Sequence, residues 1–371
     1  MNSRFSNLSA RLRTVSPPLP TVAIGFDGFV DEMITLVEKR DSLSTFSAVP
    51  SISAFGDLVS RSAGHSSLRE IMVNAIHPGG CAVNMGDGLA ALGIHVDAFA
   101  TLGQPVHPAF SEILGRFKSH RTWGREPGRT LAFEFSDGKL MFSSVSHLAE
   151  FTASHVQAML ADGAYAAACA GARVIALTNW TLYPHMTSVW RLLHEKVYSK
   201  LRHRPSFFVD LVDPSTRSAE DIREMLATLS VLESNGSLTL GVNRNEANIL
   251  ARLFSLSETT DDITATQNLA QALRDRMGIS EVVIHHIRSA AVAGTSETSA
   301  ILAPYCEKPK KSTGAGDRFN AGYCLGVLLQ LKAEERLACA CACAGFFVRN
   351  AHSPYLNELA EFLDSCEWPN P

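Results

Sequence analysis

The segment from Ser312 to Asp317 (Ser-Thr-Gly-Ala-Gly-Asp) carries the residue types best suited to phosphate chemistry, and an apolar helical pattern begins directly after it. A loop that leads into a helix presents free backbone N–H groups and the positive end of the helix dipole, which together bind phosphate oxygens. A carboxylate beside such a site is better suited to act as a base than as a phosphate ligand. The segment therefore indicates phosphoryl transfer with Asp317 as the base, although an ordinary capped helix has the same pattern.

Two acids follow the first apolar run of the chain, which covers residues 21–26. Asp27 and Asp31 come directly after this run, which is rich in β-branched residues and predicts a buried strand. Open α/β sheets bind ligands at the carboxyl ends of their strands. We therefore expect both carboxylates to face a pocket and accept hydrogen bonds from a polyol, the alternative being two solvated loop acids.

A pair of glycines, Gly79 and Gly80, precedes a predicted helix over residues 85–92. Paired glycines let a backbone approach a ligand closely. Asn84, one turn into the helix, can both donate to and accept from a sugar hydroxyl. This segment is a second candidate for binding a polyol.

Helices and strands alternate regularly between residues 154 and 242, and this alternation predicts the frame that positions these residues. The expected pairs of helix and strand are 154–170 with 174–179, 184–201 with 207–211, and 219–229 with 238–242. Such alternation gives a parallel, doubly wound sheet with right-handed crossovers. Asn179, Asp210 and Asn243 follow successive strands, so we expect them to lie on one rim of the sheet.

Further elements are expected on either side of this frame. An alternating pattern about Asp137-Gly138 predicts a β-hairpin over residues 129–142, which belongs to a small accessory sheet that could close over a ligand. The remaining predictions are helices at 247–254, 264–277, 317–331, 334–349 and 356–363, and a strand at 281–286.

The composition excludes several classes of protein. The 371 residues are 46% apolar and 19% charged, as in soluble globular proteins, and the net charge of -4 argues against a nucleic-acid partner. The longest apolar run, residues 337–348, is too short to span a bilayer and predicts a buried helix. Eight cysteines without a secretory signal predict reduced thiols in the cytoplasm. Three of them, Cys339, Cys341 and Cys343, are expected to be small core residues and not metal ligands.

Five elements in one order resemble the PfkB carbohydrate kinase family, which has the ribokinase-like fold. The resemblance extends from about Thr21 to Leu363 and implies a three-layer, mainly parallel sheet with a small β-sheet lid. It also implies a single kinase domain over 21–371, with lid segments inserted at about 32–76 and 103–150. Residues 1–20 contain no continuous apolar segment and predict a frayed leader. The five elements are Gly25-Phe26-Asp27 with Asp31, Gly79-Gly80 with Asn84, Asp213-Pro214 with Arg217, Asn243 with Glu246, and Gly314-Ala315-Gly316-Asp317.

The same resemblance implies a role for each site residue. Asp317 would take the proton from the substrate hydroxyl, and the backbone of Gly314, Ala315, Gly316 and Asp317 would form the anion hole. The residues implied to face the sugar are Asp27, Asp31, Gly79, Gly80 and Asn84. Those implied on the side of ATP are Asn243, Glu246, Thr313 and Lys311, of which Asn243 and Glu246 would hold Mg²⁺ largely through water.

Three positions depart from the family pattern. Lys311 stands where members dependent on a monovalent cation carry an acid, which leads to the hypothesis that activity needs no added K⁺. The turn after the strand at 281–286 lacks the usual glycines, so the sequence does not assign the nucleotide contacts or the phosphoryl donor. His285 and His286 either bind a metal ion as a pair or pack on the nucleotide side. Arg318 replaces a small residue and would meet either a phosphate or solvent.

The leading interpretation is a cytoplasmic, ATP-dependent kinase of a sugar or sugar-like alcohol, and analogy allows a homodimer. A nucleoside kinase of the same family is the first alternative, in which Phe29, Trp123 or Trp180 would stack on a base. A non-catalytic sugar-binding relative is the second, although the retained Asp317 argues against it. A nicotinamide-binding Rossmann enzyme is disfavoured because no G-x-G-x-x-G opens the first βα unit.

Overall fold

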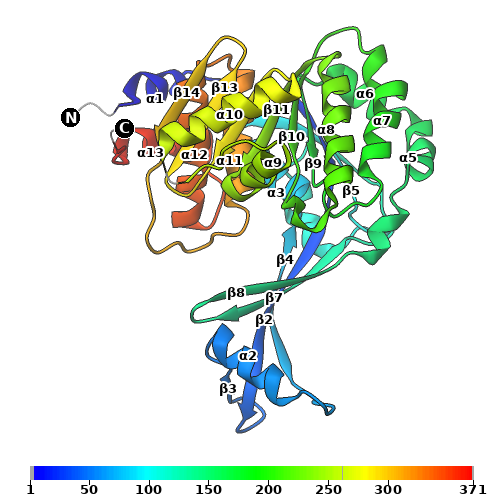
Figure 1. Ribbon diagram of the computed structural model, residues 1–371, viewed down its shortest axis with the longest axis vertical. Coiled ribbons are helices and arrows are strands. Elements are labelled where there is room, and N and C mark those ends of the chain that lie inside the picture. Colours follow the sequence, from blue (N-terminus) through cyan, green and yellow to red (C-terminus); the bar gives the residue numbers. More distant parts are fainter. Residues whose placement is uncertain (1–3, 261, 370–371) are drawn as a thin grey trace.

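The computed structural model describes residues 4–260 and 262–369 of the chain. Its frame is a nine-stranded sheet with helices on both faces, and a second, five-stranded sheet projects from one edge of this body (Figure 1). All neighbouring strands of the main sheet run parallel except the last two pairs, β12 with β13 and β13 with β14. This arrangement confirms the predicted fold class, an α/β protein with a mainly parallel, doubly wound sheet and a small sheet as lid.

The strands of the main sheet stand in the order β14-β13-β12-β11-β10-β9-β1-β5-β6. Successive strands of the alternating part are therefore neighbours, and their carboxyl ends lie along one edge. The bounds are β1 (Leu19–Phe26), β5 (Ile94–Ala100), β6 (Ser119–Thr122), β9 (Val174–Thr178), β10 (Ser206–Asp210), β11 (Ser237–Asn243), β12 (Glu281–His285), β13 (Ser289–Gly294) and β14 (Thr298–Leu302).

Two apolar cores lie on opposite faces of the main sheet. One is covered by α1 (Ser6–Arg13), α3 (Cys81–Ala91), α4 (Ser111–Leu114), α11 (Ala315–Leu328), α12 (Ala333–Asn350) and α13 (Leu356–Ser365). The other is covered by α5 (Ala153–Met159), α6 (Ala164–Gly171), α7 (Met186–Lys196), α8 (Ala219–Glu233), α9 (Arg244–Leu253) and α10 (Ile263–Met277). Short 3₁₀ turns complete the connections at Pro108–Phe110, Ser146–Glu150, Leu160–Asp162, Tyr198–Lys200 and Pro214–Thr216.

The second sheet is the lid. It consists of β2 (Phe29–Arg40), β3 (Phe46–Ala48), β4 (Ile71–Gly79), β7 (Gly128–Phe135) and β8 (Gly138–Ser144), with α2 (Ile52–Arg61) packed on its outer face. The chain passes almost directly from β1 of the main sheet into β2 of the lid (Figure 1). The hairpin of β7 and β8 was predicted from sequence and pairs in register from Arg129 with Ser144 to Phe135 with Gly138.

The start of the chain differs from the expected frayed leader. Residues 1–3 lie outside the described residues, but Ser6–Arg13 form α1, which packs against α13. Phe5, Leu8 and Leu12 recur at helical spacing and are all buried, and the Ser9 hydroxyl donates to Asp364 at 2.7 Å. An apolar helical stripe within a polar sequence therefore gives this segment a fixed place.

Two other boundaries also differ from the predictions. The helix expected over 154–170 is broken into α5 and α6, because Gly163 adopts a left-handed conformation with φ 72° that ends the first helix. The expected lid segment at 103–150 is shorter, since β6 joins the main sheet beside β5 and the lid resumes only at β7. In the described parts of the chain, no helix is long and apolar enough to cross a membrane.

Candidate active site

The loop before α11 has the geometry expected of an anion-binding helix start. Gly314 caps the helix with φ 88°, a backbone conformation that residues other than glycine rarely adopt. The N–H of Ala315 donates to the Ser312 carbonyl at 3.1 Å, which closes the turn. The N–H groups of Gly316 and Asp317 lie in the first helical turn and have no intrahelical acceptor. These two amides are therefore available to a phosphate oxygen.

Asp317 is buried at the start of this helix, with 8% of its surface exposed. Burial raises the pKa of its carboxyl group well above the ordinary 3.8, and the neighbouring carboxylates of Asp210 and Asp27 raise it further. The Arg318 guanidinium and a hydrogen bond from the Cys81 thiol act in the opposite direction on this pKa. A carboxyl group with a raised pKa is a stronger base once ionised, which is the property that a proton acceptor at neutral pH needs.

This raised pKa predicts an acid limb in the pH profile of activity. The base works only when ionised, so kcat/KM for the acceptor should rise with pH through the pKa of Asp317, at a pH above that of an exposed carboxyl. The measurement is kcat/KM from about pH 4 to pH 9 with saturating nucleotide. Thermal unfolding at each pH controls for loss of the fold, and a profile that stays flat through this range would contradict the assignment.

Asp27 lies next to Asp317 but is held by four protein donors. Its Oδ2 accepts from the N–H of Cys81 at 2.6 Å and from Asn179 Nδ2 at 2.9 Å. Its Oδ1 accepts from the Thr178 hydroxyl at 2.6 Å and from the N–H of Ala82 at 2.9 Å. The carboxylate thus fixes the start of α3 against the rim of the sheet, and its predicted contact with a substrate stays a prediction.

The paired glycines allow the lid strand β2 to approach α3. A methyl group on Gly79 would lie 2.4 Å from Asp31 Oδ2, and one on Gly80 would lie 3.0 Å from the Asp27 carbonyl oxygen. Gly80 also has φ 92° as the first residue before α3. Gly80 is therefore required by its backbone conformation and by the neighbouring backbone, and Gly79 leaves room for the Asp31 carboxyl group.

A cavity of about 560 Å³ lies between the inner face of the lid and the loop before α11. Asp31 and Asn84, both predicted to face a sugar, line it. Lys311 and Thr313, which were expected on the nucleotide side, line this cavity instead. The lid also contributes polar side chains, namely those of Asn74, His77, Glu134 and Lys139.

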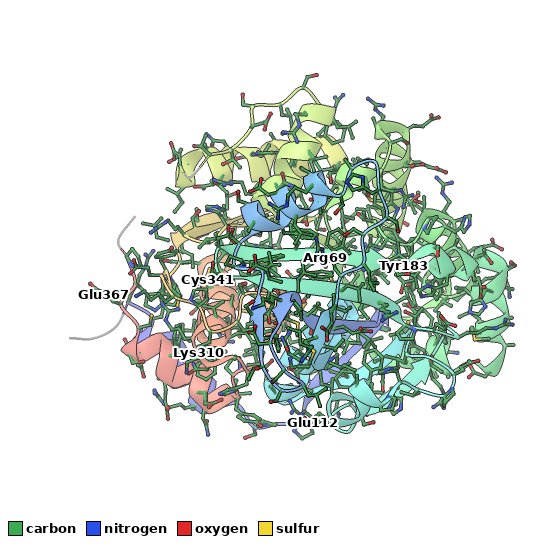
Figure 2. All side chains as sticks on the ribbon, turned by 90° about the horizontal axis from the view of Figure 1, so that it is seen from below. Arg69, Glu112, Tyr183, Lys310, Cys341 and Glu367 are labelled. Atoms are coloured by element: carbon green, nitrogen blue, oxygen red, sulfur yellow. The ribbon has the colours of Figure 1, made fainter. Side chains whose placement is uncertain are left out.

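A second cavity, of about 520 Å³, lies on the other side of the same loop. Asn243, Ala315 and Gly316 line it, together with the β12–β13 turn and one face of α12. Figure 2, seen from below, places Lys310 of the loop and Cys341 of α12 on the side of the C-terminal helices, away from Tyr183. Pro309 and Ser312 line both cavities, so the two spaces lie on either side of the anion-binding loop.

The histidines after β12 belong to the second cavity. The ring of His285 lies 4.6 Å from the ring of Phe319, centroid to centroid. Burial, followed by the neighbouring His286, lowers the pKa of His285 to about 4, so the ring is neutral. Within the described residues, no three His, Cys, Asp or Glu side chains are grouped to hold a metal ion.

Asn243 and Glu246 form the capping box of α9 at the rim of the sheet. Asn243 Nδ2 donates to Glu246 Oε1 at 2.7 Å, and the N–H of Asn243 donates to Oε2 at 2.9 Å. Burial, together with the charges of Asp210 and Asp213, raises the pKa of Glu246 to about 8. A divalent cation would offset the repulsion between these buried carboxylates. Carboxylate oxygens together with water are the ligands that Mg²⁺ prefers. The residues present therefore fit Mg²⁺ held mainly through water.

Arg318 is buried and not solvated, and its predicted contact with a phosphate stays a prediction. Its NH2 group donates to Asp87 Oδ2 at 2.8 Å, and its Nε donates to the Ser353 hydroxyl at 3.0 Å. The guanidinium also lies 4.4 Å from the centroid of the Phe347 ring. Only 6% of the Arg318 side chain and 7% of the Asp87 side chain are exposed. This buried ion pair joins α11, which carries Asp317, to α3, which carries Asn84.

The aromatic residues considered for base stacking lie elsewhere. Trp123 stacks on Phe26 at 5.2 Å in the core, and Trp180 is fully buried beneath the Arg217 guanidinium at 4.0 Å. Phe29 is buried as well. None of the three lines the cavity beneath the lid, so the feature that favoured a nucleoside acceptor is absent from it.

Comparisons with known proteins identify the family of the chain. A family model described as prokaryotic ketohexokinase matches residues 11–366. The ketohexokinase of Haloferax volcanii is 30% identical over 344 residues, which cover 92% of this chain and 90% of that protein.

Solved structures of lower identity share the fold. A carbohydrate kinase from Agrobacterium tumefaciens has a TM-score of 0.62 at 14% identity and covers 94% of this chain and 99% of its own. The ribokinase of Thermotoga maritima has a TM-score of 0.60 at 15% identity, covering 93% and 99%. Phosphofructokinase-2 from Escherichia coli has a TM-score of 0.61 at 12% identity, covering 93% and 98%. These likenesses confirm the ribokinase-like fold.

The family model and the 30% identical relative each span most of the chain and confirm the resemblance to PfkB carbohydrate kinases. The protein therefore belongs to the prokaryotic ketohexokinase family and is an ATP-dependent carbohydrate kinase.

Proposed function

We propose that this kinase transfers the γ-phosphoryl group of ATP to a hydroxyl group of a ketohexose, with Asp317 as the general base. The observation that supports the proposal most is the position of the loop before α11 between two cavities, one of them beneath a lid. The ketohexose acceptor is supported by the matched family model and by the Haloferax volcanii relative, both of which carry the name ketohexokinase.

The acceptor sugar would lie in the cavity beneath the lid. Asp31 accepts hydrogen bonds from its hydroxyl groups, and the Asn84 amide can both donate and accept. Closure of the lid excludes water, which would otherwise compete as the phosphoryl acceptor. The reacting hydroxyl points toward Asp317, whose carboxylate takes its proton as the oxygen attacks the γ-phosphorus. The bond from the γ-phosphorus to the bridging oxygen breaks, and ADP leaves with that oxygen.

The nucleotide would lie in the second cavity, with its phosphates directed at the loop. The amides of Gly316 and Asp317 donate to oxygens of the transferred phosphoryl group, where negative charge must be stabilised in a loose transition state. Asn243 and Glu246 would hold Mg²⁺ through water, and the bound ion neutralises charge on the nucleotide phosphates. Alignment of acceptor and donor across one short loop is the main contribution of the protein.

A panel of acceptors tests the proposed function. The panel contains fructose, other ketohexoses, glucose, ribose and adenosine, and ADP release is followed with Mg²⁺ and ATP. We expect a ketohexose to give the highest kcat/KM, by about tenfold or more over the aldoses. Preference for adenosine would identify the nucleoside kinase alternative and contradict the proposal.

We further propose that turnover needs no added K⁺. The position at which cation-dependent members carry an acid holds Lys311, whose ammonium group lies near the Arg318 guanidinium and would repel a monovalent cation. The initial rate should therefore be the same within about twofold in K⁺ and in tetramethylammonium at equal ionic strength. A large stimulation by K⁺ alone would contradict this proposal.

Two further proposals concern the setting of the enzyme. All eight cysteines are free thiols, which supports a reducing, cytoplasmic location.

Apolar side chains of the lid, including Val73, Ile76 and Phe142, are 44%, 52% and 50% exposed. Their exposure supports the homodimer expected by analogy, and sedimentation equilibrium would measure it.

A further inference from the structure

Lys311 occupies a position that the proposed mechanism does not use. Its side chain lines the cavity beneath the lid together with Asp31 and Asn84, and it approaches that cavity from the loop before α11. The side chain is half-buried, and its Nζ lies 5.7 Å from the centroid of the Phe347 ring. The ammonium group thus lies near an aromatic ring, while the side chain forms part of the cavity wall.

The charges around Lys311 leave its ammonium group in need of an oxygen partner. Burial and the nearby Arg318 guanidinium lower its pKa, and Asp31 and Asp87 only partly offset them. Asp31 shows the complementary behaviour, since burial raises its pKa while Lys311 acts to lower it. No salt bridge within 4.0 Å joins the two groups. A donor and an acceptor of opposite charge therefore stand apart on two walls of one cavity.

The other lysines of the cavity are less suited to this role. Lys139 forms a salt bridge with Glu134 at 3.1 Å, within the lid itself. Lys310 is exposed to solvent. Among the lysines that line the cavity, Lys311 is the one that combines partial burial with an electrostatic effect on Asp31.

We infer that Lys311 is a specificity residue of the acceptor site, which donates to sugar oxygens from the loop while Asp31 accepts from sugar hydroxyls on the lid. The inference rests on the proposed function, because the cavity must be the acceptor site. An ammonium group has three donors and no acceptor, so it can contact adjacent oxygens of a polyol. A polyhydroxylated acceptor would bridge two charges that the protein leaves apart, and its binding would draw the lid toward the loop.

The test compares Lys311→Met with Lys308→Met. Methionine keeps an unbranched apolar side chain and removes the ammonium group, with its charge and its three donors. Lys308 is exposed on the same loop and does not line the cavity, so it is a matched control. We expect Lys311→Met to weaken fructose binding by about tenfold or more, measured by calorimetry without nucleotide and as KM in the assay. The KM for ATP should stay within about twofold, Lys311→Arg should recover part of the affinity, and Lys308→Met should resemble the unchanged chain.

Two outcomes would overturn the inference. If Lys311→Met lowers kcat but leaves fructose binding without nucleotide unchanged, the ammonium group contacts the transferred phosphoryl group and not the sugar. If neither quantity changes, Lys311 contacts no ligand. Both results leave the unchanged chain active on fructose, so they differ from failure of the proposed function, in which the unchanged chain neither binds nor phosphorylates a sugar and the inference falls with it.

Discussion

Replacement of Asp317 by asparagine is expected to lower kcat by about 10²–10⁴-fold, because the amide cannot accept the proton of the acceptor hydroxyl. Asparagine has nearly the same volume and still occupies the first turn of α11, so the anion-binding amides of the loop should keep their positions. The measurement is kcat with fructose and Mg²⁺-ATP, together with the affinities for fructose and for nucleotide. Both affinities should change by less than about threefold if Asp317 acts mainly in the transition state.

The stability of this variant provides the control. Asp317 is buried beside the carboxylates of Asp210 and Asp27, which repel its ionised form. Removal of the charge should therefore leave the free energy of unfolding at neutral pH unchanged or raise it, as is common where function requires an unfavourable charge. Full activity in a folded variant would show that Asp317 is not the base.

Replacement of Arg318 by methionine is expected to destabilise the protein by about 3 kcal/mol and to impair catalysis as well. The substitution leaves Asp87 buried with only Ser353 and Arg116 as partners, and loss of one partner of a buried ion pair is costly. Because the Arg318 charge lowers the pKa of Asp317, its removal should move the acid limb of the kcat/KM profile to higher pH. Chemical unfolding and the pH profile measure the two effects separately.

Arg116 offers a matched control for this prediction. It binds the other oxygen of Asp87 at 2.7 Å, but 41% of its side chain is exposed, compared with 6% for Arg318. Arg116→Met should therefore cost less than about 1 kcal/mol and leave the pH profile in place. Equal effects of the two substitutions would mean that Arg318 contributes only to general stability. An unchanged pH profile in Arg318→Met would contradict its influence on Asp317.

The parts of the fold that could be predicted are those in which local pattern and global structure agree. The alternation between residues 154 and 242 was confirmed as β9, β10 and β11 with α7 and α8 between them, because each strand is apolar and each helix has one apolar stripe. The glycines before Asp317 predicted a helix start, and the structure gives the reason. Gly314 caps α11 in a backbone conformation that few other residues tolerate.

The features that could not be predicted depend on contacts distant in sequence. Arg318 and Asp87 are separated by 231 positions, and nothing local to either residue indicates that they meet. The contacts of Asp27 are distant in sequence as well, since its donors come from residues more than 50 and more than 150 positions away. A sequence pattern can identify such groups as polar residues on a rim, but only tertiary packing decides whether they bind a ligand or one another.

The most direct test of the central claim is the identity of the product formed from ATP and fructose by the unchanged chain. The account predicts that ADP and a singly phosphorylated ketohexose appear in equal amounts by ³¹P NMR, and that the sugar phosphate is nearly absent with Asp317→Asn. Release of ADP at the same rate with and without fructose, or formation of inorganic phosphate in place of a sugar phosphate, would contradict it.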